Sequence, residues 1–100
     1  MKRFKVYIGH NNETKEQINI NVLKENINKR YSEIIGYTIY NGLGVFKGVN
    51  TTYDEETTIL EILTDNLNYI YIEELCNYFK ELFNQECILY TEEEIEYKLI

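Results

Sequence analysis

The sequence predicts an α+β fold of the ferredoxin-like class, a four-stranded antiparallel sheet with two helices on one face. The main observation is the order of hydrophobic patterns, which alternate or follow helical spacing in the sequence β-α-β-β-α-β. The length of 100 residues, 44% of them hydrophobic, indicates one domain over residues 1–100 with a single core. Proline is absent and glycine occurs only five times, which favours long elements with few turns.

A strand and a helix are expected first. Residues 3–8 alternate between apolar and polar side chains, and Gly9 ends this strand. Thr14 and Gln17 have the spacing of a capping box, in which two backbone amides are satisfied reciprocally, so we expect the helix to begin there and run to about Tyr31. Its predicted core positions are Ile18, Val22, Leu23, Ile27 and either Tyr31 or Ile34.

A hairpin is expected next. Residues 37–48 are predicted to form the second strand, and Gly42 and Gly44 within it indicate a bulge or a close approach of the backbone. A turn over residues 49–52 leads into a third strand over residues 53–64, which is rich in Thr, Ile and Leu. The two strands are long enough to pair with each other.

The last third is predicted to be a helix and a strand. Residues 69–84 have the clearest helical spacing in the chain, and Asn84 is a suitable C-cap. The apolar positions of this helix are Ile72, Leu75, Cys76, Phe79, Leu82 and Phe83. Residues 86–91 are expected to form the fourth strand, and residues 95–100 to extend it or to form a fifth after an acidic turn at 92–94.

The predicted strands carry more apolar side chains than two helices can cover. Since successive side chains of a strand point to opposite faces, both faces of this sheet would be partly apolar. A two-sided apolar sheet in a chain of 100 residues favours a homo-oligomer. The residues concerned are Phe4, Val6, Tyr7, Ile8, Ile39, Val45, Leu60 and Ile62.

Charge is divided by position along the chain. Residues 1–30 carry seven Lys/Arg and three acidic residues, whereas residues 53–100 carry thirteen acidic residues against Lys80 and Lys98. The early cations are suited to hold a small phosphorylated ligand or to meet the acidic half of a second copy. A net charge of −7 argues against tight binding of duplex DNA.

Composition also bears on metals, redox state and location. Cys76 and Cys87 form no CxxC pair and His10 is the only histidine, so we expect no metal site. Both cysteines are predicted to be buried free thiols, which suggests a reducing compartment. No apolar run approaches membrane-spanning length and no signal peptide is expected, so a cytoplasmic protein is predicted, without a membrane partner.

Catalytic motifs are scarce. The sequence has no Walker loop, no GxGxxG and no HExxH, and a Cys–His dyad would join a loop histidine to cysteines predicted to be buried. Paired carboxylates such as those at 73–74 and 92–94 are expected to be solvated faces. These features predict a protein that is not an enzyme and needs no cofactor.

Two segments are candidate ligand sites. In residues 40–48, glycines allow close backbone approach, Tyr40 or Phe46 is suited to stack on a base, and Lys47 to neutralise a phosphate. The alternative is a bulged strand with Phe46 in the core. In residues 9–12, polar groups follow a strand and precede a helix, which suits a polar ligand group but also describes an ordinary turn. Gln85 is suited to read a base edge, although strand entry explains it as well.

Four motifs together resemble the phage anti-Thoeris signal-sponge family. They are Lys-Val-Tyr-Ile-Gly-His-Asn at 5–11, Gly-Leu-Gly-Val-Phe-Lys-Gly at 42–48, Thr-Ile-Leu-Glu-Ile at 58–62 and Phe-Asn-Gln-Glu-Cys-Ile-Leu at 83–89. The resemblance implies a non-catalytic, oligomeric anti-defence protein that sequesters cyclic nucleotide immune signals, either cyclic ADP-ribose isomers or cyclic oligonucleotides.

The resemblance implies a ligand site with three kinds of residue. Family pockets combine an aromatic side chain with arginines from different protomers, but this chain has only Arg3 and Arg30, so lysines must take part of that role. The candidates are Tyr40 and Phe46 for stacking, Lys24, Arg30 and Lys47 for phosphates, and His10, Asn12 and Gln85 for polar contacts.

Two other classes of function remain open at this point. An acidic protein–protein inhibitor of a host defence complex, similar to an anti-CRISPR nucleic-acid mimic, would place the late carboxylates in a basic groove. A ligand-dependent enzyme of unknown type is the third possibility.

Overall fold

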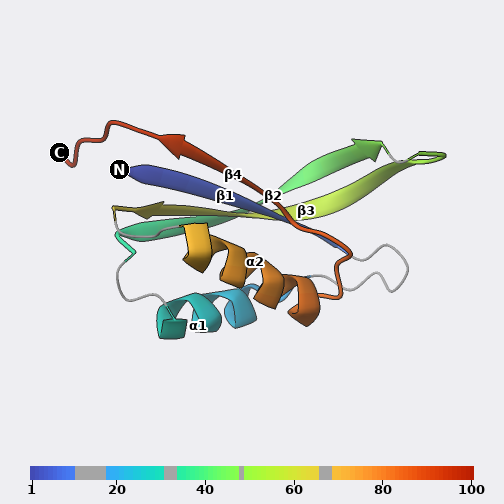
Figure 1. Cartoon of the computed structure of the whole chain (residues 1–100), viewed down its shortest axis with the longest axis horizontal. Helices are drawn as coiled ribbons and strands as arrows, with labels where there is room; N and C mark the ends of the chain where they lie inside the picture. The colour runs from blue at the N-terminus through green and yellow to red at the C-terminus, as the bar shows by residue number, and fades with distance from the viewer. Residues whose placement is uncertain (11–17, 31–33, 48, 66–68) are drawn as a thin grey trace.

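The computed structural model describes residues 1–10, 18–30, 34–47, 49–65 and 69–100. The elements are β1 (Lys2–Gly9), α1 (Ile20–Arg30), β2 (Gly36–Lys47), β3 (Thr52–Thr64), α2 (Tyr69–Leu82) and β4 (Leu89–Glu94). All neighbouring strands pair antiparallel in the order β2-β3-β1-β4, and both helices lie on one face of the sheet (Figure 1). The ferredoxin-like arrangement predicted from the sequence is confirmed.

The core lies between the sheet and the helices. Phe4, Val6 and Ile8 of β1 point toward the helices because they alternate with residues that point away. They are buried together with Leu60 and Ile62 of β3, Leu23 and Ile27 of α1, and Ile72, Leu75, Cys76 and Phe79 of α2. Five of the residues expected to need a partner chain are therefore covered by the helices, namely Phe4, Val6, Ile8, Leu60 and Ile62.

Neither α1 nor α2 lies on the other face of the sheet, which is called the open face below. By strand register it presents Arg3, Lys5, Tyr7, Tyr40, Thr57, Ile59, Glu61 and Leu89. Charged side chains thus alternate with apolar ones, so this face is less apolar than the sequence suggested. The reason is that most of the large aliphatic side chains share the phase that points to the helices.

The helix ends follow local capping chemistry. The backbone amides of Asn21 and Val22 donate to Asn19 Oδ1 at 3.0 and 3.4 Å, so Asn19 is the N-cap and α1 begins at Ile20. The helix therefore starts later than predicted; Thr14 and Gln17, the expected capping box, lie outside the described residues.

The C-terminal end of α2 matches the prediction at Asn84. This residue has a φ of 52°, and the amide of Gln85 donates to the carbonyl of Lys80 at 2.8 Å. A residue in the left-handed region, followed by a hydrogen bond from the next amide to the carbonyl five residues earlier, is the Schellman motif at a helix C-terminus. Asparagine is the common substitute for glycine in this motif.

Several expectations about strands are wrong. β4 spans Leu89–Glu94, so Glu92–Glu94 belong to the strand rather than to a turn, and residues 95–100 form no strand. Cys87, expected to be buried in that strand, is exposed before it. The register of β2 with β3 runs unbroken from Gly36 to Lys47, so the described glycines make no bulge.

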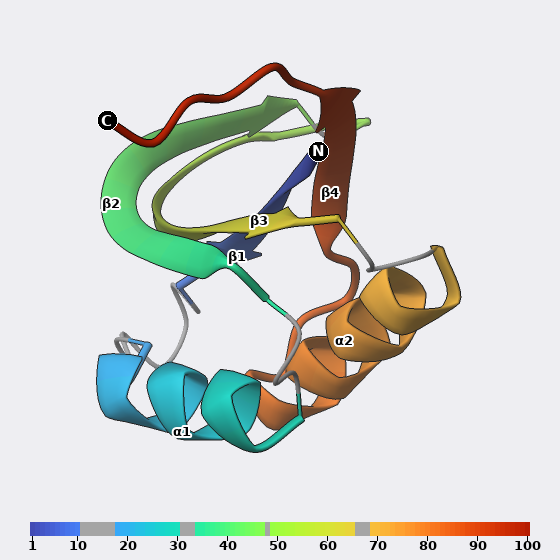
Figure 2. The same ribbon diagram turned by 90° about the vertical axis from the view of Figure 1, so that its left-hand side faces the viewer.

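The β2–β3 hairpin is strongly curved. Figure 2 shows its far half bending over the open face, on the side away from the helices. We call this part, residues 42–47 and 52–57, the arch. Within the described residues, neither helix combines the length and the apolar character needed to cross a membrane.

Replacing Phe79 should test the core. The Phe79 side chain is 0% exposed, and Phe79→Ala should lower the free energy of unfolding by about 3–5 kcal/mol through lost burial and the cavity that remains. Leu82→Ala on the same helix, at a side chain 42% exposed, should cost less than about 1 kcal/mol. Urea denaturation followed by circular dichroism measures both, and equal losses would contradict the position of the core.

The two cysteines should differ in reactivity. Burial, with a smaller contribution from Glu73, raises the pKa of the Cys76 thiol to about 11, whereas Cys87 is exposed. At pH 8 a thiol reagent should label Cys87 rapidly and Cys76 only after unfolding, since the thiolate is the reactive form.

The same shift predicts a pH effect on stability. Because the folded pKa lies above the ordinary value of 9.0, stability from the protonated Cys76 is complete below about pH 9 and is lost as the pH rises toward 11. Cys76→Ala should flatten the dependence of the unfolding midpoint on pH in that range. Rapid labelling of Cys76 in the folded protein would contradict both expectations.

Candidate functional site

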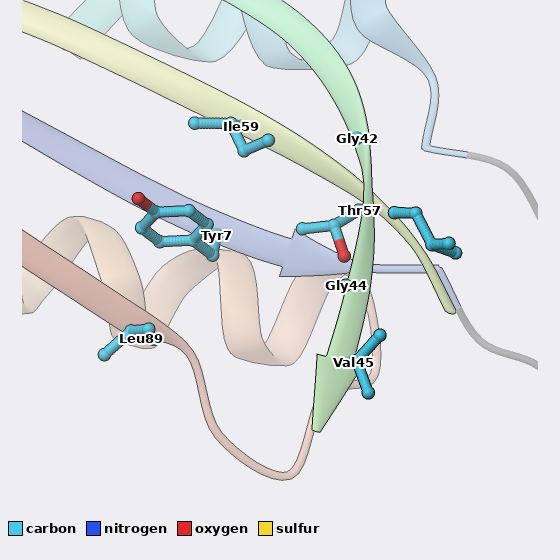
Figure 3. A pocket seen from close by; sticks show the side chains of 8 residues that line it. Tyr7, Gly42, Gly44, Val45, Thr57, Ile59 and Leu89 are labelled. Atoms are coloured by element: carbon cyan, nitrogen blue, oxygen red, sulfur yellow. The ribbon is translucent and has the colours of Figure 1, made fainter. Parts of the chain in front are cut away.

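A hollow of about 310 Å³ lies on the open face beneath the arch (Figure 3). The sheet contributes its floor and the arch contributes one wall. The lining residues are Tyr7, Gly42, Leu43, Gly44, Val45, Thr57, Ile59 and Leu89.

The floor of the hollow follows from the strand register. Tyr7 of β1 pairs with Ile59 of β3 on one side and with Leu89 of β4 on the other, so these three side chains form one row. Thr57 and Gly42 form the next row, since they pair with each other across β3 and β2. Figure 3 shows Tyr7, Ile59 and Leu89 side by side, whereas the Val45 side chain points away from them on the other side of β2.

Glycine keeps this space open. A Cβ at Gly42 would lie 3.4 Å from Ile59 Cδ1, so a larger side chain there would extend into the hollow. Gly42 does not have a positive φ, and its value to the site is therefore the missing side chain rather than an unusual backbone.

The lining is mostly apolar and has few polar groups. The Tyr7 hydroxyl has no hydrogen-bond partner among the described residues, and the Thr57 hydroxyl donates to the backbone carbonyl of Glu55 at 3.4 Å. Apolar walls with a small number of polar groups are typical of small-molecule sites, and an aromatic ring with a polar tip suits a flat heterocycle.

The early cations of the chain pair with its own acidic segment. Because β1 and β4 are antiparallel neighbours, Lys2 meets Glu92 and Arg3 meets Glu93, and Arg3 also lies 3.8 Å from Glu61. The hydrogen bond from Arg3 to Glu93 raises the pKa of Arg3. The division of charge seen in the sequence is therefore partly an intramolecular complementarity across one strand pair.

A row of hydrogen-bonded polar side chains, two of them buried, lies on the helix side at the base of the arch. His10 is 7% exposed; its Nε2 is 2.8 Å from Thr58 Oγ1, which donates to Asn41 Oδ1 at 3.0 Å. Since the threonine proton is used for Asn41, Nε2 of His10 must be the donor to Thr58. The row joins the end of β1 to β3 and β2 where the hairpin begins to curve. Nδ1 of His10 lies 3.4 Å from Glu56 Oε2.

The structure brings together only some of the predicted ligand residues. Gln85 Nε2 donates to the carbonyl of Gly9 at 2.7 Å, which places Gln85 beside His10. Tyr40 is on the open face and its hydroxyl donates to Glu61 at 3.4 Å. Tyr40 therefore lies apart from Gln85 and His10, and the three residues do not share one cleft.

The predicted phosphate partners are dispersed. Lys24 and Arg30 lie on α1, in the helix layer, and the Arg30 guanidinium packs over the Tyr78 ring at 4.1 Å. Lys47 is at the far end of β2. Asn12 lies outside the described residues, and so does the side chain of Phe46.

Sequence reasoning missed Tyr7, Thr57, Ile59 and Leu89. Alternation shows only that successive side chains point to opposite faces, and the register is needed to show that these residues meet across β3, β1 and β4. Among the residues that the structure describes, no group of three His, Cys, Asp or Glu side chains is placed to hold a metal ion.

No family profile matches the sequence, and no curated protein matches it. Solved structures do match. A phage SAM lyase in complex with S-methyl-5′-thioadenosine has a TM-score of 0.70 at 19% identity and covers 93% of this chain and 80% of its own. A phage SAM lyase in the apo state gives a TM-score of 0.66 at 18% identity, covering 92% of this chain and 78% of its own. A point mutant of CutA1 from Pyrococcus horikoshii gives 0.62 at 13% identity, covering 99% of this chain and 87% of its own. At these identities the likeness establishes the shared fold.

These neighbours correct the prediction that the chain is not an enzyme. Two of the matching structures are of a lyase, so this fold supports catalysis, and the poor inventory of motifs in the sequence was not a sound reason to exclude it. The match to a phage protein agrees with the resemblance to phage proteins, but it does not extend to the anti-Thoeris sponge family.

Proposed function

We propose that this chain is an enzyme that cleaves S-adenosylmethionine (SAM), with the adenosyl part of the substrate in the hollow beneath the arch. The observation that supports this most is the hollow itself. It is an apolar space on the open face of a fold shared with a SAM lyase, and its tyrosine hydroxyl has no partner among the described residues.

The size and the lining of the hollow suit an adenosyl group. A volume of about 310 Å³ lies at the lower end of the roughly 300–1,000 Å³ found for small-molecule sites. The flat adenine ring would contact Ile59 and Leu89, while Tyr7 and Thr57 offer hydroxyls to ring nitrogens or to the ribose.

The chemistry needs no external reductant or oxidant. SAM is a sulfonium cation; when the bond from sulfur to its aminobutyrate chain breaks, the electron pair stays on sulfur and gives neutral S-methyl-5′-thioadenosine. The four-carbon fragment is completed by loss of a proton or by attack of its own carboxylate on the carbon that leaves sulfur. Apolar walls favour this step because they solvate a cation poorly and a neutral thioether well.

A phosphate-bearing signal fits this site less well. Cyclic nucleotides need cations or amide donors for their phosphates, and the described lining of the hollow contains no Lys or Arg. We therefore propose SAM consumption rather than signal sequestration as the basis of a phage anti-defence role. Assembly into a homo-oligomer and a cytoplasmic location remain part of the proposal.

Turnover of SAM tests the proposed function. Incubation of the purified chain with SAM should produce S-methyl-5′-thioadenosine, identified by liquid chromatography and mass spectrometry. SAM and the thioadenosine should each raise the melting temperature by several degrees at concentrations well above Kd. No product and no shift with either compound, together with a shift caused by a cyclic ADP-ribose isomer, would sink the proposal.

Filling the hollow should weaken binding without unfolding the chain. In Gly42→Leu the new side chain would enter the space beside Ile59, so the affinity for S-methyl-5′-thioadenosine should fall by at least about tenfold, as calorimetry would show. Gly36→Leu is the matched control in the same strand, because a Cβ at Gly36 meets nothing within 4 Å. Equal affinities for the two variants would place the ligand elsewhere.

A further inference from the structure

We propose that Glu55 is the ligand-binding carboxylate that gives the hollow its preference for a positively charged adenosyl compound. The inference rests on the proposed function and adds the group that distinguishes the cationic substrate from the neutral thioadenosine.

Because Gly9 has no side chain, the Glu55 carboxylate can lie directly on the open face of the sheet. A Cβ built at Gly9 would collide with Oε1 and Cδ of Glu55, so the carboxylate occupies the space that a side chain at residue 9 would fill. Gly9 is buried at the end of β1, and the absence of a side chain there is what lets an acidic group lie flat on the strand.

This carboxylate is next to the hollow. Gly9 pairs with Thr57 and Glu55 pairs with Gly44, and both Thr57 and Gly44 line the hollow. The Thr57 hydroxyl also donates to the backbone carbonyl of Glu55. Glu55 therefore stands at the edge of the site where the arch begins, beyond the row formed by Tyr7, Ile59 and Leu89.

Glu55 differs from neighbouring carboxylates in its lack of a cationic partner within the described part of the chain. Glu61 and Glu93 lie against Arg3, and Glu56 lies against His10. Across the described ranges, by contrast, no Lys, Arg or His pairs with Glu55. It is half-buried, so its negative charge is screened less than that of a fully exposed group.

The charge of the substrate is complementary to this arrangement. SAM carries a sulfonium and an ammonium on the half of the molecule that extends away from adenine, whereas S-methyl-5′-thioadenosine carries neither. With adenine in the apolar part of the hollow, that cationic half reaches the edge where Glu55 lies. An ionic contact there favours the substrate and lets the neutral product leave.

Calorimetry with Glu55→Gln tests the inference. The change keeps the shape of the side chain and removes its charge, so the Kd for SAM should rise roughly 10- to 100-fold, as expected for loss of a hydrogen-bonded charge. The Kd for S-methyl-5′-thioadenosine should stay within about twofold of the wild-type value, because a neutral ligand gains little from the carboxylate charge. Glu74→Gln, an exposed carboxylate on α2, is the charge-matched control and should leave both values unchanged.

Gly9→Ala provides a second variant. Its methyl group takes the place of the carboxylate, so it should produce the same selective loss of SAM affinity while the folded circular dichroism spectrum is retained. S-adenosylhomocysteine, which has the ammonium but no sulfonium, identifies the contact: its affinity falls in Glu55→Gln if the ammonium is bound and is unchanged if the sulfonium is bound.

The outcomes separate the two proposals. Unchanged SAM affinity in Glu55→Gln, or a parallel loss for SAM and the thioadenosine, would overturn the role of Glu55 while leaving the adenosyl site intact. Failure of the wild-type chain to bind either compound would overturn the proposed function and this inference with it.

Discussion

The pairing of β1 between β3 and β4 is the constraint on which the rest of the structure depends. One face of this strand supplies Phe4, Val6 and Ile8 to the core, and the other supplies Tyr7 and the space over Gly9 to the site. Its first residues also neutralise the acidic β4. Because a slip of one residue would exchange the two faces, the core that fixes the register also fixes the composition of the hollow.

The curvature of the hairpin turns an otherwise flat sheet face into a site. Without the arch, Tyr7, Ile59 and Leu89 would form a shallow apolar patch open to water; with it, residues 42–45 of β2 also line the space. The row of His10, Thr58 and Asn41 joins the end of β1 to β3 and β2 at the point where the curve begins. His10 and Thr58 are buried, and a hydrogen bond between buried polar groups is costly to break, so this bond stabilises the base of the arch.

Charge serves two different purposes in this chain. Several acidic groups near β1 are paired with its cations: Glu92 and Glu93 of the edge strand β4 pair with Lys2 and Arg3, and Glu61 of β3 lies near Arg3. Glu55 is set apart from them by Gly9, and it keeps its charge available at the edge of the site. A strongly acidic chain is therefore compatible with a small cationic ligand, whereas the positions of Lys24 and Arg30 on α1 offer little to a phosphate.

Local patterns in the sequence determined the element order, the phase of each strand and the stop at Asn84, since alternation, helical spacing and capping act within a few residues. They did not decide which face of each strand enters the core, because apolar residues such as Tyr7 and Val6 occur in both phases of one strand. Only the tertiary structure decided that Tyr7 lies between Ile59 and Leu89, that Gly9 makes room for Glu55, and that Lys2 and Arg3 are matched by β4. These contacts join residues about 50 to 90 positions apart, and they depend on strand register and on the curvature of the sheet, which no local pattern encodes.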